Sequence, residues 1–396
     1  IAQQTGLEHV YQNGATGKLM MVEGFGGGVG ALDYDLDGNW DLLFSQGGDP
    51  AADPDPDQPP VGFFRNLPNP NSQRRFVSVA AESGLGRYGY GQGVAVGDYN
   101  ADGFDDVYLT CVGPNVLLEN MGDGTFRDVT EKSGTEDGSQ WSSSAAFADL
   151  TGDGNLDLYV CNYLEYDPRD PIDCRKPNGE RRICQPRETP PLDDACFVNL
   201  GDGSFRDQAP QRGLVADGSK SLGVAVADFD SNGSPDIYVA NDTTSNFLFI
   251  NDGESHFQDH ALLYGCAVNF EGLCQAGMGL AINDYNGDGL LDIYVTHYFE
   301  ESNTLYRNLG ARGFLDVTSR LGLHRPTMQS LGFGVVMSDL DQNGLADMFI
   351  TNGHVEYYPE NPVLEMTPQV FQYDGDRWLD IIGWCGEFFD KYLVGR

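Results

Sequence analysis

The sequence predicts an all-β protein in which a unit of four short strands occurs six times. A nine-residue acidic loop with the approximate pattern DxDxDGxxD recurs, and each copy runs into an apolar stretch rich in β-branched and aromatic residues. Hairpin signals such as Gly122-Asp123-Gly124 follow these stretches. The copies, numbered loops 1 to 6, start at Asp33, Asp98, Asp149, Asp228, Asp284 and Asp339. Four-stranded units that repeat about every fifty residues are propeller blades, so one β-propeller domain is expected over residues 1–396.

The second repeat shows the whole unit. Residues 93–97 form a first predicted strand, and the acidic loop at Asp98 turns the chain into a second strand at 107–110. A third strand follows at 115–118 and a fourth at 125–129. Six such units are complete within the chain.

Each acidic loop is predicted to hold a metal ion. Side-chain oxygens at positions one, three and five converge, glycine at position six permits the sharp turn, position seven offers its backbone carbonyl, and the aspartate at position nine closes the site. The predicted ligands are Asp33, Asp35, Asp37, Asn39, Asp41, Asp98, Asn100, Asp102, Phe104, Asp106, Asp149, Thr151, Asp153, Asn155, Asp157, Asp228, Asp230, Asn232, Ser234, Asp236, Asp284, Asn286, Asp288, Leu290, Asp292, Asp339, Asp341, Asn343, Leu345 and Asp347.

The ligand chemistry favours calcium. All ligands are hard oxygens, and Mg²⁺ is disfavoured because it keeps most of its waters. An EF-hand is excluded, since position twelve of each loop lies in a β-rich run instead of supplying a bidentate Glu before a helix. About six Ca²⁺ ions are therefore expected.

The charge of the chain limits its partners. Of the 60 acidic residues, four in loop 1 and three in each of the other loops are predicted ligands, and the formal net charge is −37. Six Ca²⁺ would leave about −25 (−37 + 12), which disfavours nucleic acid and anionic membranes as partners.

The cysteines of the chain indicate a location outside the cytoplasm. No apolar run reaches the length of a transmembrane helix, and Ile1 is not followed by a signal region, so any signal peptide is expected to have been removed. The 8 cysteines lack zinc-site spacing and indicate disulfides. The expected pairs are Cys174 with Cys184, Cys266 with Cys274, and Cys161 with Cys196, which leaves Cys111 and Cys385 unassigned.

Several short sequence motifs resemble those of a known protein family. They are Asn13-Gly14-Ala15-Thr16-Gly17-Lys18, Gly26-Gly27-Gly28-Val29, Val239-Ala240-Asn241-Asp242-Thr243-Thr244, Gln275-Ala276-Gly277-Met278-Gly279, Asn303-Thr304-Leu305-Tyr306-Arg307-Asn308 and Thr351-Asn352-Gly353-His354. The repeats resemble the FG-GAP or VCBS blades of integrin α-like propellers, and more closely the cartilage acidic protein and UnbV-type secreted family. The resemblance implies a calcium-loaded propeller, extracellular or periplasmic, that serves in binding; it implies no known reaction.

Recognition of a protein or glycan is expected at the blade ends opposite the acidic loops. Both long insertions, near 49 to 60 and at 162–195, fall at those ends, where rigid scaffolds usually carry binding residues. The insertion at 162–195 concentrates positive charge at Lys176, Arg181 and Arg182. It is either a partner contact or a disulfide-pinned loop whose arginines are satisfied by acidic neighbours.

An enzyme is the alternative. His297 and His354 follow second strands of neighbouring repeats and could meet near the central channel, where a lyase or dehydratase acting on carbohydrate would place its acid and base. The candidate ligand-binding residues are Asp242, Thr243, Asn246, His297 and His354. There is no GxSxG elbow, P-loop, HExxH or dinucleotide fingerprint, so a binding or assembly module is the first choice.

The chain ends suggest how the ring closes. Residues 1–7 read like the end of a fourth strand, and the chain stops where another first strand would be expected. A seven-position ring, completed by further residues or by a partner chain, is therefore expected. The alternative is a six-bladed ring closed by the N-terminal segment.

Overall fold

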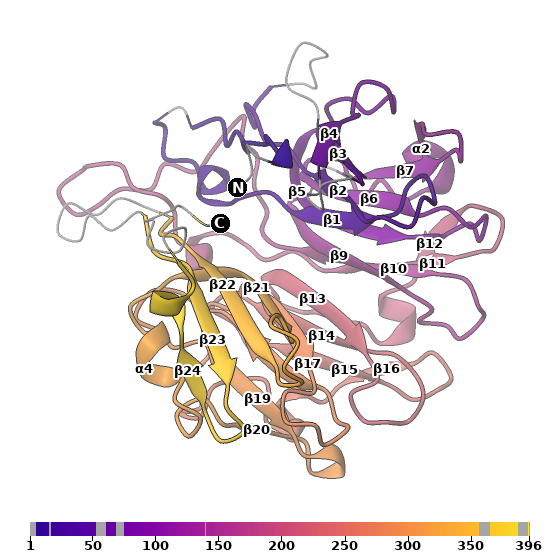
Figure 1. The fold of residues 1–396 in the computed structure, drawn as a ribbon. Coiled ribbons are helices and arrows are strands. Elements are labelled where there is room, and N and C mark those ends of the chain that lie inside the picture. The colour runs from indigo at the N-terminus through magenta and orange to yellow at the C-terminus, as the bar shows by residue number, and fades with distance from the viewer. Residues whose placement is uncertain are drawn as a thin grey trace. The chain divides into compact units, whose positions relative to one another are not determined.

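Six antiparallel four-stranded sheets make up the computed structural model, which describes residues 5–15, 17–52, 61–68, 75–138, 140–355, 365–386 and 395. The predicted all-β propeller of six four-stranded blades is confirmed. The chain divides into two compact units, residues 1–209 and 210–396, with three blades in each. In Figure 1 the blades of the first unit run from indigo to magenta and those of the second from pink to yellow.

Some sequence-based predictions fall on residues outside this description. Residues 53–60 of the first predicted insertion are among them, as are 69–74 of the first hairpin and most of both chain ends. The choice between a six- and a seven-position ring therefore stays a prediction.

The first unit contains blades 1 to 3. Blade 1 is β1 (Val29–Leu32), β2 (Asp41–Phe44), β3 (Gly62–Leu67) and β4 (Arg75–Ser78); blade 2 is β5 (Tyr90–Gly97), β6 (Asp106–Val112), β7 (Val116–Asn120) and β8 (Phe126–Asp128); blade 3 is β9 (Ser142–Ala148), β10 (Asp157–Asn162), β11 (Ala195–Asn199) and β12 (Phe205–Asp207). Short helical turns are η1 (Met21–Gly24), α2 (Thr130–Ser133) and η2 (Pro186–Glu188). In each sheet the strands lie in chain order.

The second unit contains blades 4 to 6. Blade 4 is β13 (Ser221–Ala227), β14 (Asp236–Asn241), β15 (Phe247–Asn251) and β16 (Phe257–Asp259); blade 5 is β17 (Leu280–Asn283), β18 (Asp292–Val295), β19 (Thr304–Asn308) and β20 (Phe314–Asp316); blade 6 is β21 (Gly332–Ser338), β22 (Asp347–Asn352), β23 (Gln369–Tyr373) and β24 (Trp378–Asp380). The helical turns are η3 (Pro210–Arg212), α3 (Ala261–Tyr264), η4 (Gly310–Arg312), α4 (His324–Thr327) and η5 (Ile382–Trp384).

The hydrophobic core lies between neighbouring blades. All residues of β6, β10, β14 and β18 are buried. Strands β6 and β18 each pack against a neighbouring blade on both faces. One core cluster joins Leu43 of blade 1 to Leu109 of blade 2, and another joins Tyr294 of blade 5 to Met348 of blade 6. Apolar packing thus runs from blade to blade within each unit.

In blades 2, 3 and 5, an asparagine near the end of the third strand reaches the acidic loop of the preceding blade. In blade 2 the Asn120 side chain donates to the carbonyl oxygens of Asp105 (3.3 Å) and of Tyr34 in loop 1 (2.9 Å), and accepts from the Gly122 N–H (3.1 Å). Asn199 makes the same inter-blade bond to Tyr99 (2.8 Å). In the second unit Asn308 does so to Phe229 (2.8 Å).

A second set of inter-blade bonds comes from hydroxyl groups of second strands. Thr110 accepts from the Gly93 N–H in its own blade (2.7 Å) and donates to the Ser143 carbonyl of the next blade (3.1 Å). Thr296 repeats this arrangement with Gly279 (2.8 Å) and Phe333 (2.8 Å). Blades 2 and 3 are therefore joined by both kinds of contact, through Asn199 and through Thr110.

The asparagine contact predicts the effect of a substitution. Asn120→Ala removes three side-chain hydrogen bonds and leaves the Tyr34 and Asp105 carbonyls without this donor, so the free energy of unfolding should fall by about 2–3 kcal/mol. Urea unfolding measures the change. Asn66→Ala is the matched control, since the Asn66 side chain donates only to Trp40 (2.9 Å) and its Oδ1 has no partner. Equal losses in both variants would contradict the inter-blade role.

Candidate functional site

The six acidic loops share one backbone geometry. In loop 1 the Asp33 carboxylate accepts the N–H groups of Asp37 (3.0 Å) and Gly38 (2.9 Å). The aspartate at position one of every other loop accepts the same two N–H groups, at positions five and six. In loop 1 the carboxylates of positions one, three and five lie close together. The predicted convergence of these positions in the other loops stays a prediction.

Position four has a backbone requirement that the sequence analysis missed. Glycine at position six has positive φ in every loop, as expected. Position four is also left-handed in every loop, with Leu36 at φ 56°, Ala101 at 57°, Ser231 at 63° and Gln342 at 61°. Glycine occupies this position only in loops 3 and 5. Four loops therefore hold a side chain in a conformation that L-residues adopt at a cost of about 1 kcal/mol.

The aspartate at position nine is the first residue of the second strand and is buried. Asp41, Asp106, Asp157, Asp236 and Asp292 are fully buried, and in each the Oδ1 accepts the backbone N–H of the third-strand asparagine. Burial raises the pKa of Asp106 to about 8 and of Asp292 to about 7. It raises the pKa of Asp41, Asp157 and Asp236 to about 6. A bound cation would supply positive charge that favours the ionised form of these carboxylates.

Blades 1 and 6 depart from this pattern. In blade 6 Tyr373 replaces the asparagine, and its N–H donates to Ala346 (3.1 Å), so Asp347 Oδ1 has no hydrogen-bond partner. In blade 1 the residue two positions after Asn66 is Pro68, which has no N–H to donate to Asn66 Oδ1.

The donor set fits a hard divalent cation. Carboxylate oxygens lie within 4.8 Å of one another in three groups: Asp33, Asp35 and Asp37; Asp228, Asp230 and Asp236; Asp339, Asp341 and Asp347. Three buried carboxylate oxygens in the loops have no hydrogen-bond partner, namely Asp35 Oδ1, Asp41 Oδ2 and Asp347 Oδ1. Unpaired buried acceptors are costly, and a cation is the partner that suits acceptor-only groups. Loops 2, 3 and 5 carry Asn or Thr at position three and so bring fewer carboxylates together.

Three candidate ligand-binding residues lie at the opposite end of blade 4, where they support the backbone. Asn246 accepts from the Asn241 N–H (2.9 Å) and donates to Tyr238 Oη (2.9 Å), so both ends of its amide are engaged. Asp242 pairs through its backbone with Ala276, and Thr243 has a φ of 62° and donates to the Asp242 carbonyl (2.6 Å). Their ligand-binding role stays a prediction.

The two histidines follow the second strands of blades 5 and 6, or lie close to their ends. His354 packs against the rings of Tyr298 (5.5 Å) and Phe299 (5.7 Å), the residues that follow His297. His297 is fully buried, which lowers its pKa to about 3, and its Nδ1 has no hydrogen-bond partner. His297 is therefore neutral at physiological pH and poorly suited to proton transfer near neutrality.

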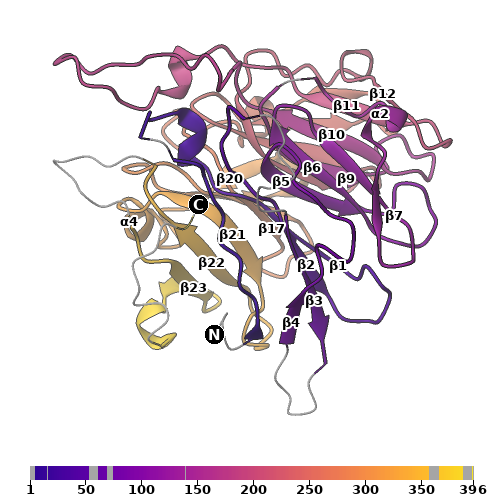
Figure 2. The same ribbon diagram turned by 90° about the horizontal axis from the view of Figure 1, so that it is seen from above.

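The insertion at 162–195 is pinned by the predicted disulfide between Cys174 and Cys184, with a Cα–Cα distance of 5.3 Å. Asp173 pairs with Arg175 (2.7 Å) and Arg181 (3.0 Å). Figure 2 shows the insertion, in magenta to pink, extending away from the strands of blade 3. Arg182 contacts Glu188 through two nitrogens, at 2.8 and 2.6 Å. Arg181 and Arg182 thus both pair with acidic neighbours in the same insertion. A partner contact at this insertion stays a prediction.

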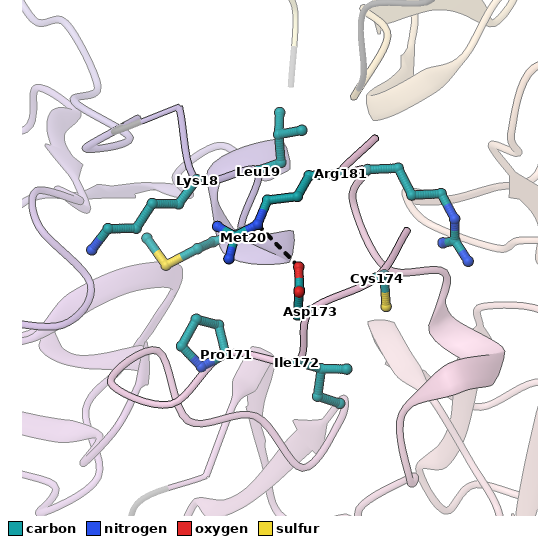
Figure 3. A pocket seen from close by; sticks show the side chains of 9 residues that line it. Lys18, Leu19, Met20, Pro171, Ile172, Asp173, Cys174 and Arg181 are labelled. Carbon is teal, nitrogen blue, oxygen red and sulfur yellow. Dashed lines mark ion pairs between the residues drawn. The ribbon is translucent and has the colours of Figure 1, made fainter. Parts of the chain in front are cut away.

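A pocket lies between the insertion and the segment before η1. It is lined by Lys18, Leu19, Met20, Pro171, Ile172, Asp173, Cys174, Arg181 and Arg182. In Figure 3 Arg181 reaches over this pocket, and its ion pair with Asp173 crosses it. Three cationic side chains and one carboxylate therefore surround an apolar lining in a strongly acidic chain.

Two predicted disulfides are wrong in this structure. Cys161 and Cys196 are not joined by a disulfide and are buried in the adjacent strands β10 and β11. Cys196 pairs with Tyr159, so Cys161 is displaced diagonally by two residues, a spacing of about 7–8 Å that exceeds the reach of a disulfide. Cys266 is also free and fully buried, whereas Cys274 is exposed, so these two lie at different depths. Cys111, Cys161 and Cys196 lie within strands that extend beyond the predicted ends.

Thiol titration tests this assignment. Burial raises the pKa of Cys111 to about 12 and also raises those of Cys161 and Cys266, so these thiols should not react in the native protein. A disulfide-exchange reagent should react fastest at Cys274, which Cys274→Ser removes, and more slowly at Cys385, which is half-buried and whose pKa burial raises. Without reductant, the unfolded chain should show the 6 free cysteines of the structure. A smaller number would reveal a further disulfide.

Among the described residues, no helix has the length and apolar character needed to cross a membrane.

Comparisons with known proteins agree with the repeat structure. A family model for the FG-GAP-like repeat matches residues 98–160, 190–239 and 284–350, and two of these matches begin at the first aspartate of an acidic loop. Cartilage acidic protein 1 of Xenopus tropicalis is 30% identical over 227 residues, covering 56% of this chain and 31% of the relative. The Homo sapiens protein is 29% identical over 243 residues, covering 60% of this chain and 32% of the relative. The aligned part is about a third of these relatives.

Solved propeller structures are similar at lower identity. A lectin of Agrocybe aegerita, described as recognising non-reducing terminal N-acetylglucosamine, has a TM-score of 0.49 and 15% identity, covering 89% of this chain and 78% of its own. The SapL1 lectin in complex with alpha methyl fucoside has a TM-score of 0.43 and 11% identity, covering 90% and 95%. In sequence, the match to the FG-GAP-like repeat and the alignments to cartilage acidic protein 1 confirm the resemblance that the repeats suggested. The chain therefore carries FG-GAP-like repeats and is homologous to cartilage acidic protein 1.

Proposed function

We propose that this protein is a calcium-stabilised binding module in which the six acidic loops hold Ca²⁺ and the opposite blade ends recognise a protein or glycan. The common backbone geometry of the six loops carries this proposal. Each loop wraps around the carboxylate at position one and ends on a buried carboxylate at position nine. Such a geometry gathers several oxygen ligands at one point, which suits the six to eight ligands that Ca²⁺ takes.

The electrostatics of the loops support a structural role for the ion. The buried aspartates at position nine are disfavoured as anions in the protein alone, and the other loop carboxylates repel them. A divalent cation bound in the loop would attract the buried aspartate and would also offset the repulsion among the loop carboxylates. Binding to the folded state alone would add about 2.7 kcal/mol per site at a calcium concentration one hundred times the dissociation constant.

An extracellular or periplasmic location fits this chemistry. Calcium reaches millimolar levels outside cells, where modules with weak sites remain filled. A disulfide such as Cys174–Cys184 also persists in an oxidising compartment. The name of the relatives, cartilage acidic protein, supports the same compartment.

The pocket at the insertion is the proposed contact for the partner. Its lining combines apolar residues with Lys18 and Arg181, and the disulfide and the Asp173 ion pairs hold its wall in place. A partner that presents an acidic group beside an apolar surface would suit this lining. An enzymatic role has no such support, because His297 is buried and neutral.

Calcium removal tests the structural role. Chelation by excess EDTA should lower the melting temperature by several degrees or more, and returned Ca²⁺ should restore it. Differential scanning calorimetry provides the measurement. Mg²⁺ at the same concentration is the control and should restore much less. An unchanged melting curve in EDTA would reject the calcium role.

The size of the calcium effect should depend on pH. Burial raises the folded-state pKa of Asp106 to about 8 and of Asp292 to about 7, so the ion-free protein is favoured while these groups are protonated and loses stability as pH rises from about 4 to 8. Ca²⁺ binds the ionised forms. The increase in melting temperature on adding calcium should therefore be larger at pH 8 than at pH 5.5, and the reverse order would contradict this account.

Charge reversal in the pocket tests recognition. Calcium-loaded protein is applied to an array of glycans and purified matrix proteins, and Arg181→Glu should weaken the strongest signal at least tenfold. Arg187→Glu is the matched control, because Arg187 is exposed in the same insertion but does not line the pocket. Equal binding by both variants and the wild type would place recognition elsewhere.

A further inference from the structure

One residue of each third strand varies in charge where the loops are otherwise alike. The residue directly before the third-strand asparagine, or before Tyr373 in blade 6, points toward the acidic loop in three blades. The six residues at this position are Arg65, Glu119, Val198, Ile250, Arg307 and Gln372. The chain therefore places a cation, an anion, an apolar group or a neutral amide at equivalent positions.

The two arginines contact predicted calcium ligands. Arg65 Nη2 lies 2.5 Å from Asp35 Oδ2 and 3.3 Å from Asp37 Oδ2. Arg307 Nη2 lies 2.9 Å from Asp288 Oδ2. Both guanidinium groups are only partly exposed, and so are their carboxylate partners, so solvent screens these pairs incompletely.

Blade 6 supplies a natural comparison. Gln372 Nε2 donates to Asp341 Oδ2 at 2.8 Å, which is the same kind of contact made by a neutral group. The amide orients the ligand carboxylate without adding positive charge. Comparing loop 6 with loops 1 and 5 therefore separates orientation of the ligand from charge.

The net charges of the loops differ accordingly. Loop 5 has three aspartates and one arginine, a formal charge of −2, whereas loop 6 has three aspartates and a neutral amide, a charge of −3. Loop 1 has four aspartates and Arg65, so its formal charge is −3. Loop 5 is thus less negative than either loop 1 or loop 6.

We propose that Arg65 and Arg307 are built-in counter-ions that weaken calcium binding at their own loops, and that loop 5 binds calcium more weakly than loop 6. The inference rests on the proposed function, in which the loops bind Ca²⁺. At a calcium concentration that leaves loop 5 empty, Arg307 still balances part of its charge. Loss of calcium is therefore tolerated unequally by the blades.

The physical reason is repulsion between the arginine and the ion. A guanidinium that binds the outer oxygen of a ligand carboxylate lies on the order of 5 Å from an ion bound to the inner oxygen. Even in a water-like dielectric, a single and a double positive charge at this distance repel enough to reduce affinity about tenfold. The arginine also withdraws charge from the ligand carboxylate. A side chain that only orients a ligand carboxylate would increase calcium affinity, but a neutral amide such as Gln372 orients the carboxylate equally well.

Reciprocal substitutions in the full chain test this inference. Calcium-free protein is titrated with CaCl₂ by isothermal calorimetry. Arg307→Gln should tighten one of the weaker sites about tenfold, and Arg65→Gln should do the same at loop 1. Gln372→Arg should weaken one site about tenfold, because it gives loop 6 the contact found in loop 5.

Melting in EDTA provides a second readout. Arg307→Gln should lower the melting temperature of the calcium-free protein, because the loop carboxylates lose their counter-ion, and should increase the gain on adding calcium. Tighter binding in the arginine variants with weaker binding in Gln372→Arg supports the proposal. Weaker binding after Arg307→Gln would overturn it and make the arginine a positioning residue. Unchanged calcium affinity at all six sites in every variant would also overturn the proposal, but would leave the proposed function intact. Absence of calcium binding in the wild type would reject the proposed function itself.

Discussion

The structure depends on a buried hydrogen bond that, in blades 1 to 5, joins the aspartate at the start of the second strand to the asparagine near the end of the third. In blade 2, Asp106 Oδ1 accepts the Asn120 N–H at 2.8 Å, and the side chain of the same asparagine reaches loop 1 of the preceding blade. One pair of residues thus fixes the acidic loop, the sheet and the neighbouring blade. The apolar clusters between blades supply most of the stabilisation, and this polar contact sets the register in which they pack.

This arrangement has an electrostatic cost that explains the acidity of the chain. A carboxylate held at the base of each loop is needed for the hydrogen bonds, but burial disfavours its charged form. A cation bound by the same loop would relieve that cost and the repulsion among the outer carboxylates. In loops 1 and 5 an arginine from the third strand supplies part of this positive charge from within the chain. Fold stability and cation binding are therefore two aspects of the same contacts.

The blades and loops were predictable because their signals are local and repeated. Spacing of aspartates and glycine gave the loop positions, and short apolar runs gave the strands. The contact of Asn120 with Tyr34 was not predictable, since it joins residues separated by 86 positions and requires the packing of two blades. The wrong pairing of Cys161 with Cys196 had the same origin, because strand register decides whether two cysteines face each other. The left-handed conformation of Leu36 was missed because leucine gives no sign of it in sequence.

The account rests on the acidic loops acting as calcium sites in the folded protein. Native mass spectrometry of the calcium-equilibrated chain counts bound ions directly, without reference to stability. The account predicts a folded charge-state distribution with successive calcium additions that saturate at about six ions per chain, and their loss after chelation. A folded chain that retains no calcium under these conditions would contradict it.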